Sequence, residues 1–145
     1  MSILPQIHAL SGCATTASPF YIGKKSVVKT VLKHGPVRFA NLSSVSEIDI
    51  AAAVNASHAL VALWYNPTEK FKHCHEDLNL LRTRMASTKI TPLSCLPPCG
   101  ELFKENVKRV IWQVRLWTFA SMLDFGGKPD DFGWEVRNGI LKPVM

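Results

Sequence analysis

One stretch of sequence, ELFKENVKRVIWQVRLWTFASML (Glu101–Leu123), decides the fold class. Its apolar residues recur every three or four positions, which is the spacing that places side chains on one buried face of an α-helix. This stripe comprises Phe103, Val107, Val110, Ile111, Val114, Trp117 and Ser121. The basic residues of the stretch lie largely off the stripe. We therefore predict one nearly continuous helix over 101–123, ending before Gly126-Gly127.

Most of the remaining chain is predicted to be helical as well. Apolar residues at helical spacing over 24–34 are followed by Gly35-Pro36, a typical stop signal. Ser44 and Glu47 resemble a capping box that opens the next helical region, which Asn66-Pro67 ends. Asn55 is a candidate break within that region. The predicted segments besides 101–123 are an apolar stretch over 3–11 and helices over 24–34, 47–65 and 72–87.

The C-terminal residues carry a different signal. Asn138-Gly139 lies between two short runs with apolar residues, a pattern typical of a β-hairpin turn. An isolated two-stranded ribbon is marginal in water, so an irregular tail is the alternative. We expect a mainly α protein with one helical domain over 1–125 and a tail over 126–145.

Composition narrows the class of protein. With 145 residues, 47% hydrophobic and 19% charged, the chain fits one ordinary globular domain and excludes disordered, collagenous and low-complexity classes. No apolar run reaches the roughly 20 residues that a membrane span needs, and the first ten residues lack the pattern of a secretory signal. We therefore expect no membrane association, an intracellular location and four reduced cysteines.

The net charge of +6 is unevenly distributed. Residues 1–46 contain five basic residues and no Asp or Glu, whereas basic and acidic residues nearly balance from Glu47 onward. A one-signed basic segment is typical of a surface that faces an anionic partner. Nucleic acid is the first candidate partner and an anionic membrane the second.

Within this basic segment, a glycine precedes a predicted helix that carries evenly spaced lysines. A glycine there lets backbone N–H groups approach an anion closely. Lysines four residues apart share one helix face. The candidate phosphate-binding residues are Gly23, Lys24, Lys25, Lys29 and Lys33. The alternative is a surface helix with solvated lysines and a capping glycine.

The same region resembles a known DNA-binding element. The sequence His8-Ala9-Leu10-Ser11-Gly12-Cys13-Ala14-Thr15-Thr16, followed by Phe20 and Ile22-Gly23-Lys24-Lys25, resembles the helix–two-turn–helix of the flap-endonuclease branch of the PIN-like nucleases. The likeness is closer to uncharacterised PIN-like proteins of animals, many of them associated with mobile elements. Weaker matches to that group are Leu80-Leu81-Arg82, Leu96-Pro97-Pro98, Val107-Lys108-Arg109 and Phe132-Gly133-Trp134.

The resemblance implies a role for residues 1–45. In the family this element holds the sugar–phosphate backbone of duplex DNA, often around a monovalent cation. It therefore implies weak binding to duplex DNA or structured nucleic acid and allows a nuclear location. Apart from that cation, no cofactor is expected.

Two departures from the family pattern argue against catalysis. Ala14 stands where the family carries an Asp that helps to hold metal, and no carboxylate precedes Glu47. Two-metal hydrolysis needs several carboxylates to hold cations about 3.5–4 Å apart, so Mg²⁺ would be expected only with an intact nuclease site. We interpret the chain as the C-terminal part of a nuclease-like protein, a non-catalytic remnant that binds the nucleic-acid backbone.

Two other interpretations remain open. The chain could be a protein-interaction fragment, in which the 101–123 helix exposes apolar surface that a protein partner covers. It could also be one half of a nuclease that needs a further N-terminal part.

Other candidate residues carry weaker signals. Zinc could be held by Cys74-His75, Cys95, Cys99 and His73, but their spacing matches no common zinc pattern, so buried or idle thiols are favoured. His8 is expected to be a packing residue. Burial against a neighbouring helix is favoured for Trp112 over base stacking. Asp130-Asp131 is expected to be a solvated turn.

The carboxylate pattern generates a first prediction. The purified chain, incubated with flap, duplex or single-stranded DNA and Mg²⁺ or Mn²⁺, should show no cleavage above a protein-free control, because Ala14 supplies no metal ligand. The measurement is gel analysis of labelled substrates. Cleavage that co-purifies with the chain and disappears with EDTA would contradict the prediction.

Overall fold

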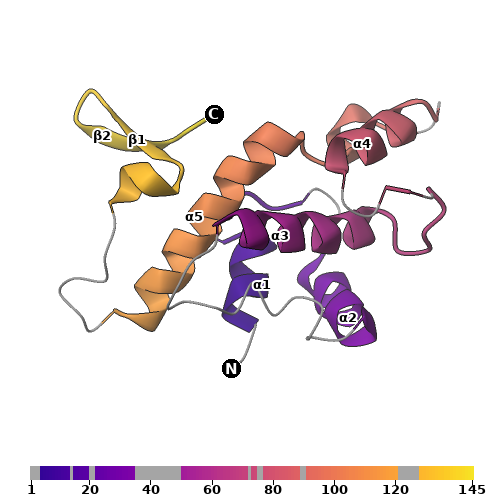
Figure 1. The fold of residues 1–145 in the computed structure, drawn as a ribbon, viewed down its shortest axis with the longest axis horizontal. Coiled ribbons are helices and arrows are strands. Elements are labelled where there is room, and N and C mark those ends of the chain that lie inside the picture. The colour runs from indigo at the N-terminus through magenta and orange to yellow at the C-terminus, as the bar shows by residue number, and fades with distance from the viewer. Residues whose placement is uncertain are drawn as a thin grey trace.

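The computed structural model describes residues 4–13, 15–19, 22–34, 50–71, 73–74, 77–88, 91–120 and 128–145. These residues confirm a mainly helical fold with a short C-terminal hairpin. In Figure 1, α3 and α5 cross near the middle of the molecule, with α4 at one end and the hairpin at the other. The elements are α1 (Leu4–Leu10), α2 (Lys24–His34), α3 (Ile50–Tyr65), α4 (Leu78–Ala86), η2 (Leu93–Cys95), α5 (Gly100–Thr118), η3 (Pro129–Phe132), β1 (Trp134–Arg137) and β2 (Ile140–Pro143).

The apolar face of α5 forms the centre of the core. It packs against α1 and α3, and α3 in turn packs against α2 and α4. The predicted stripe on α5 is buried at Phe103, Val107, Val110 and Val114. These side chains meet a cluster from the other helices that includes Ile7, Leu10, Val27, Val31, Leu60, Val61, Leu63, Leu78 and Leu81. The periodicity over this part of the sequence therefore predicted the buried face correctly.

The C-terminal end of α5 differs from the prediction. The helix ends at Thr118, because Phe119 (φ −113°, ψ 25°) leaves the helical conformation while its N–H still bonds the carbonyl of Arg115. The predicted helix is thus wrong at 119 and 120, and 121–127 lies outside the described residues. Trp117, predicted to be buried, is 43% exposed. Its ring lies 5.7 Å from that of His8 on the surface, since the last turn of α5 extends beyond the core.

The helix α3 is continuous, so the candidate break at Asn55 is wrong. It ends before Asn66-Pro67 as predicted, and the Asn66 side chain closes the following loop by bonding both the N–H and the carbonyl of Phe71, at 3.3 and 3.0 Å. The capping box at Ser44 and Glu47 lies outside the described residues. No helix within the described ranges combines the length and apolar character needed to cross a bilayer.

The helix α4 begins six residues later than predicted. The side chain of Asp77 accepts a hydrogen bond from the N–H of Leu80 at 2.9 Å, which is the geometry of an N-cap. His73 has φ of +61°, a left-handed conformation that no helix interior accommodates. The predicted start at 72 is therefore wrong. From its middle turn, Arg82 donates to the carbonyl of Pro97 and ties α4 to the segment before α5.

The predicted hairpin is confirmed. Asn138 and Gly139 both have positive φ, 54° and 74°, as a type I′ turn requires, and β1 pairs antiparallel with β2. Arg109 of α5 donates from Nη1 to the carbonyls of Gly133 and Val144, at 3.1 and 3.2 Å, one on each side of the ribbon. A Cβ on Gly133 would stand 2.6 Å from the carbonyl oxygen of Glu105. The ribbon is ordered because α5 holds its base.

The burial pattern on α5 yields a prediction about stability. Val110→Asp should lower the free energy of unfolding by about 3 kcal/mol or more, because it places an unpaired carboxylate in the core. Leu102→Asp is the matched control, since Leu102 is about half exposed in the first turn of the same helix. Urea denaturation followed by circular dichroism measures both. Equal stability of the two variants would contradict the packing of α5.

Candidate nucleic-acid interface

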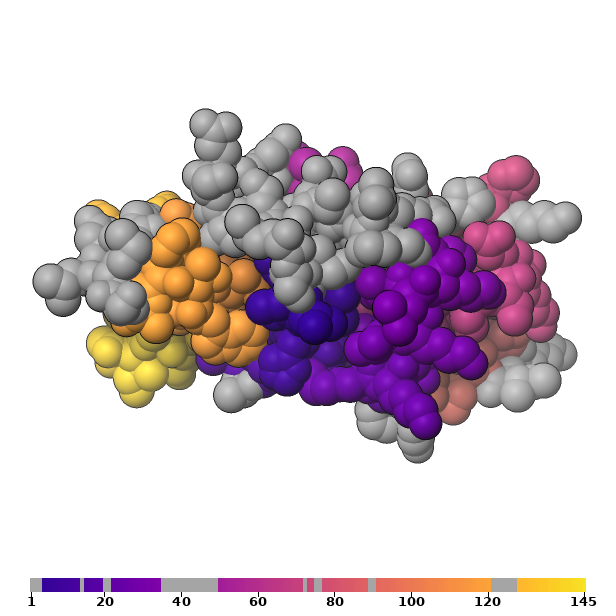
Figure 2. All heavy atoms as spheres, turned by 90° about the horizontal axis from the view of Figure 1, so that it is seen from below, coloured from indigo at the N-terminus to yellow at the C-terminus, as the bar shows by residue number. Residues whose placement is uncertain are grey.

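The helix α2 presents a row of lysines on the surface. Lys25, Lys29 and Lys33 are exposed and spaced by four residues, so they share one face. Val27 and Val31, on the opposite side, are buried in the core. Figure 2 shows α2, in purple, at the surface next to α1. The amphipathic pattern thus turns the three ammonium groups toward solvent.

Lys24 has a different environment from the other three lysines. Its Nζ donates to the Gly12 carbonyl at 2.7 Å, to Ser11 Oγ at 3.1 Å and to the His8 carbonyl at 3.2 Å. These acceptors lie at the C-terminal end of α1, where unpaired carbonyls and the helix dipole favour a cation. Lys24 therefore joins α2 to α1, a structural role that sequence reasoning did not assign to it.

Gly23 stands at the start of α2. Its carbonyl accepts from the N–H groups of Ser26 and Val27, at 3.0 and 3.2 Å, which makes it the N-cap. Apart from its chain neighbours, no atom of the described residues lies within 4 Å of a Cβ added to Gly23. Among the described residues, neither space nor conformation therefore demands a glycine at this position, and Gly23 itself places no side chain over the first turn.

A groove of about 400 Å³ runs beside the lysine row. Lys29 and Lys33 lie on its α2 side, and Trp64, Pro67 and Thr68 lie on the other. Ser26, Thr30, Ile22 and His34 complete its lining. The lysines are thus placed at the margin of a hollow and not on a flat surface.

The predicted turn after α1 is anchored to α5. Gly12 has φ of +100°, and a Cβ there would collide with Ser18, so glycine is required. Thr15 Oγ1 donates to Gln113 Oε1 at 2.6 Å, and the N–H of Ala17 donates to Asn106 Oδ1 at 3.1 Å. The position of Ala14 lies outside the described residues. The threonines of this motif thus fasten the turn to the core.

The thiol of Cys13 is part of the same turn. Its backbone N–H donates to Thr16 Oγ1 at 3.1 Å, and its Sγ lies within hydrogen-bonding distance of the hydroxyls of Thr15 and Thr16. Partial burial raises the pKa of Cys13, but hydrogen bonds from these threonines outweigh that effect and hold the pKa below its ordinary value. The cysteine thereby helps to close the turn.

The candidate zinc ligands, His8 and Trp112 do not form a functional site among the described residues. No group of three or more potential metal ligands occurs in the part of the chain that the structure describes, which does not include His75. The fully buried Cys74 belongs to the core. His8 is exposed, so its predicted packing role is wrong beyond its contact with Trp117. Trp112 lies 5.1 Å from the ring of Phe132.

Asp130 and Asp131 are exposed in η3, as expected of a solvated turn. Apolar side chains are exposed on α2, where Val28 is 37% and Leu32 74% exposed, and near the two ends of α5, at Leu102 and Trp117. Among the described residues of 101–123, the apolar surface that the protein-interaction interpretation requires is thus limited to these two side chains, because the middle of the stripe is buried.

Sequence reasoning missed the polar residues of α5 that organise this end of the molecule. Asn106, Arg109 and Gln113 bond segments more than twenty residues away in the chain. Their spacing of three and four residues places them on one side of the helix, beside the apolar stripe. The spacing of these polar residues beside the apolar stripe was the sequence signal that could have indicated their contacts with other segments.

Comparison of the chain with known protein families, with curated proteins and with solved structures finds no match in any of the three.

The role of Lys24 is open to a direct test. Lys24→Met should lower the free energy of unfolding by about 1 kcal/mol, because the C-terminal carbonyls of α1 lose their cation. Lys25→Met, the neighbouring exposed lysine, should leave it nearly unchanged. Thermal and urea unfolding measure both. An unchanged Lys24→Met variant would show that the cap contributes nothing.

Proposed function

We propose that this chain binds the phosphate backbone of duplex DNA or structured nucleic acid, weakly and without hydrolysing it, through Lys25, Lys29 and Lys33 on α2. The observation that carries the proposal is the row of three exposed ammonium groups in a segment, 1–46, whose sequence has no carboxylate. From 25 to 33 an α-helix rises about 12 Å, and a duplex carries one phosphate per ~1.7 Å of axis. Several phosphates therefore come within reach of the row.

The surroundings of the row support the same chemistry. The groove beside Lys29 and Lys33 gives a nucleic-acid backbone room to approach the lysines from the side. The first turn of α2, over which Gly23 places no side chain, adds backbone N–H groups and the positive end of the helix dipole. Descent from a PIN-like nuclease, a monovalent cation at this element and a nuclear location belong to the proposal through the sequence resemblance.

The number of lysines available for phosphate contacts determines the expected affinity for nucleic acid and its dependence on salt. Lys24 is bonded to the end of α1, which leaves three lysines for phosphate contacts. Counterion release at about 0.9 per contact gives a slope of log K against log salt near −3. The affinity should lie in the non-specific range, ~10⁻⁴–10⁻⁶ M at physiological salt.

A protein partner is the competing function. It is favoured by Val28 and Leu32, the exposed apolar residues on the same helix. Binding through that surface would depend weakly on salt and would survive loss of the lysines. The two functions therefore differ in a measurable way.

Charge reversal tests the proposal. Lys25→Glu with Lys29→Glu should weaken binding to a labelled duplex by about tenfold or more and reduce the salt slope by about 2, because two phosphate contacts are lost. Fluorescence anisotropy at several salt concentrations is the measurement. Lys24 is left intact so that the link to α1 stays in place.

A matched control separates local from overall charge. Lys70→Glu with Lys104→Glu changes the net charge equally at exposed positions off α2, and should keep most of the binding. Circular dichroism checks folding. If both double variants lose affinity equally, or if Lys25→Glu with Lys29→Glu binds as the parent does, the α2 face is not the nucleic-acid site.

A further inference from the structure

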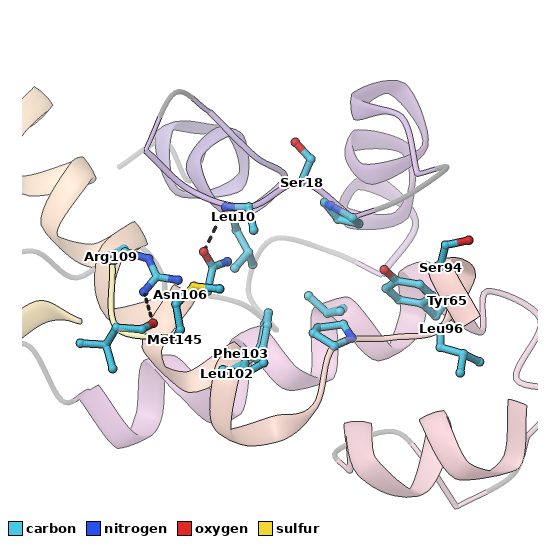
Figure 3. A pocket seen from close by; sticks show the side chains of 15 residues that line it. Leu10, Ser18, Tyr65, Ser94, Leu96, Leu102, Phe103, Asn106, Arg109 and Met145 are labelled. Atoms are coloured by element: carbon cyan, nitrogen blue, oxygen red, sulfur yellow. Dashed lines mark hydrogen bonds between the residues drawn. The ribbon is translucent and has the colours of Figure 1, made fainter. Parts of the chain in front are cut away.

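A second hollow shares no lining residue with the groove beside α2. It is a pocket of about 340 Å³ between the 17–19 loop, α3, α5 and the C-terminus (Figure 3). Most of its wall is apolar, with contributions from Leu10, Val61, Leu96, Leu102 and Phe103. Pockets for small molecules begin at about 300 Å³, and a dry 150 Å³ cavity already holds benzene. The pocket therefore has room for a molecule larger than one aromatic ring.

Two buried polar side chains interrupt the apolar wall on one side. Asn106 and Arg109 are 7% and 8% exposed, and both line the pocket from α5. The Oδ1 of Asn106 accepts from the N–H of Ala17, as a dashed line in Figure 3 shows. This bond orients the amide so that its Nδ2 donors face elsewhere. A donor and a cation thus lie one helical turn apart.

Arg109 has no ion-pair contact with any carboxylate of the described residues. Its Nη1 bonds the carbonyls of Gly133 and Val144, but no carboxylate of the described residues lies within 4 Å of the guanidinium. The nearest acid in sequence on α5, Glu105, is instead paired with Lys108 at 2.7 Å. Burial lowers the pKa of Arg109, although Glu105 opposes that shift. Buried cations are normally paired in direct contact, whereas Glu105 acts on Arg109 only at longer range, so the guanidinium is left without a contacting anion.

We propose that the pocket binds a small molecule with an apolar body and a single carboxylate, which pairs with Arg109 while the body lies against Leu96, Leu102 and Phe103. A guanidinium presents parallel N–H donors that match a carboxylate, and Nη1 is the nitrogen occupied by the hairpin. Asn106 Nδ2 is placed to donate to the same group. This site is separate from the lysine face of α2, and none of its lining residues belongs to that helix.

The test compares two probes of equal chain length, octanoate and 1-octanol, on the intact chain. Titration is followed by ¹H–¹⁵N NMR at the Ala17 amide and the Asn106 side chain. Octanoate should bind about tenfold or more tightly than octanol, the worth of a charge-assisted hydrogen bond. No octanoate binding, or equal binding of the two probes, would overturn the proposal without any variant being made.

Variants then assign the residues. Arg109→Met should remove the preference for octanoate and leave octanol binding unchanged, and the amide signals of Glu135 and Lys142 report whether the hairpin stays docked. Ala17→Phe, at the pocket wall, should abolish binding of both probes, whereas Ala86→Phe, an exposed alanine on α4, should bind as the parent does. Retained preference in Arg109→Met, or retained binding in Ala17→Phe, would refute the assignment.

Discussion

The burial of one face of α5 against α1 and α3 is the constraint on which the rest of the structure depends. It aligns Phe103, Val107, Val110 and Val114 in the core and thereby orients the polar residues beside them. Gln113 and Asn106 then reach the turn after α1, and Arg109 reaches the base of the hairpin. The turn after α1 and the C-terminal hairpin, both too short to be stable alone, are thus held in place by α5.

Two cations bond backbone carbonyls of other elements, with different consequences. Lys24 and Arg109 each donate to backbone carbonyls of another element. Lys24 does so at the surface, where water completes its solvation. Arg109 does so from a buried position, where no carboxylate of the described residues is in ion-pair contact with it. This contrast explains why one residue is a cap and the other defines a candidate site.

Segments far apart in the sequence are joined by direct contacts. Thr15 bonds α5, Arg82 bonds Pro97, and Arg109 bonds Gly133. The first segment also supplies the acceptors that hold Lys24, which positions α2 and its row of lysines. These contacts gather distant segments around α5 and leave the lysine row of α2 facing outward, so the proposed backbone-binding face and the proposed ligand pocket lie on different surfaces.

The sequence by itself determined the features whose cause is local. The span of α2, the end of α3 at Asn66 and the turn at Asn138-Gly139 follow from neighbouring residues, because caps, prolines and glycines act within one or two turns of backbone. Only the tertiary structure decided the role of Lys24, the exposure of Trp117 and the pocket at Arg109. Each depends on residues distant in the chain. Lys24 depends on the end of α1, the exposure of Trp117 depends on where the core stops along α5, and the pocket depends on the contact between Arg109 and the hairpin. No periodicity or spacing encodes which distant segment a side chain will meet.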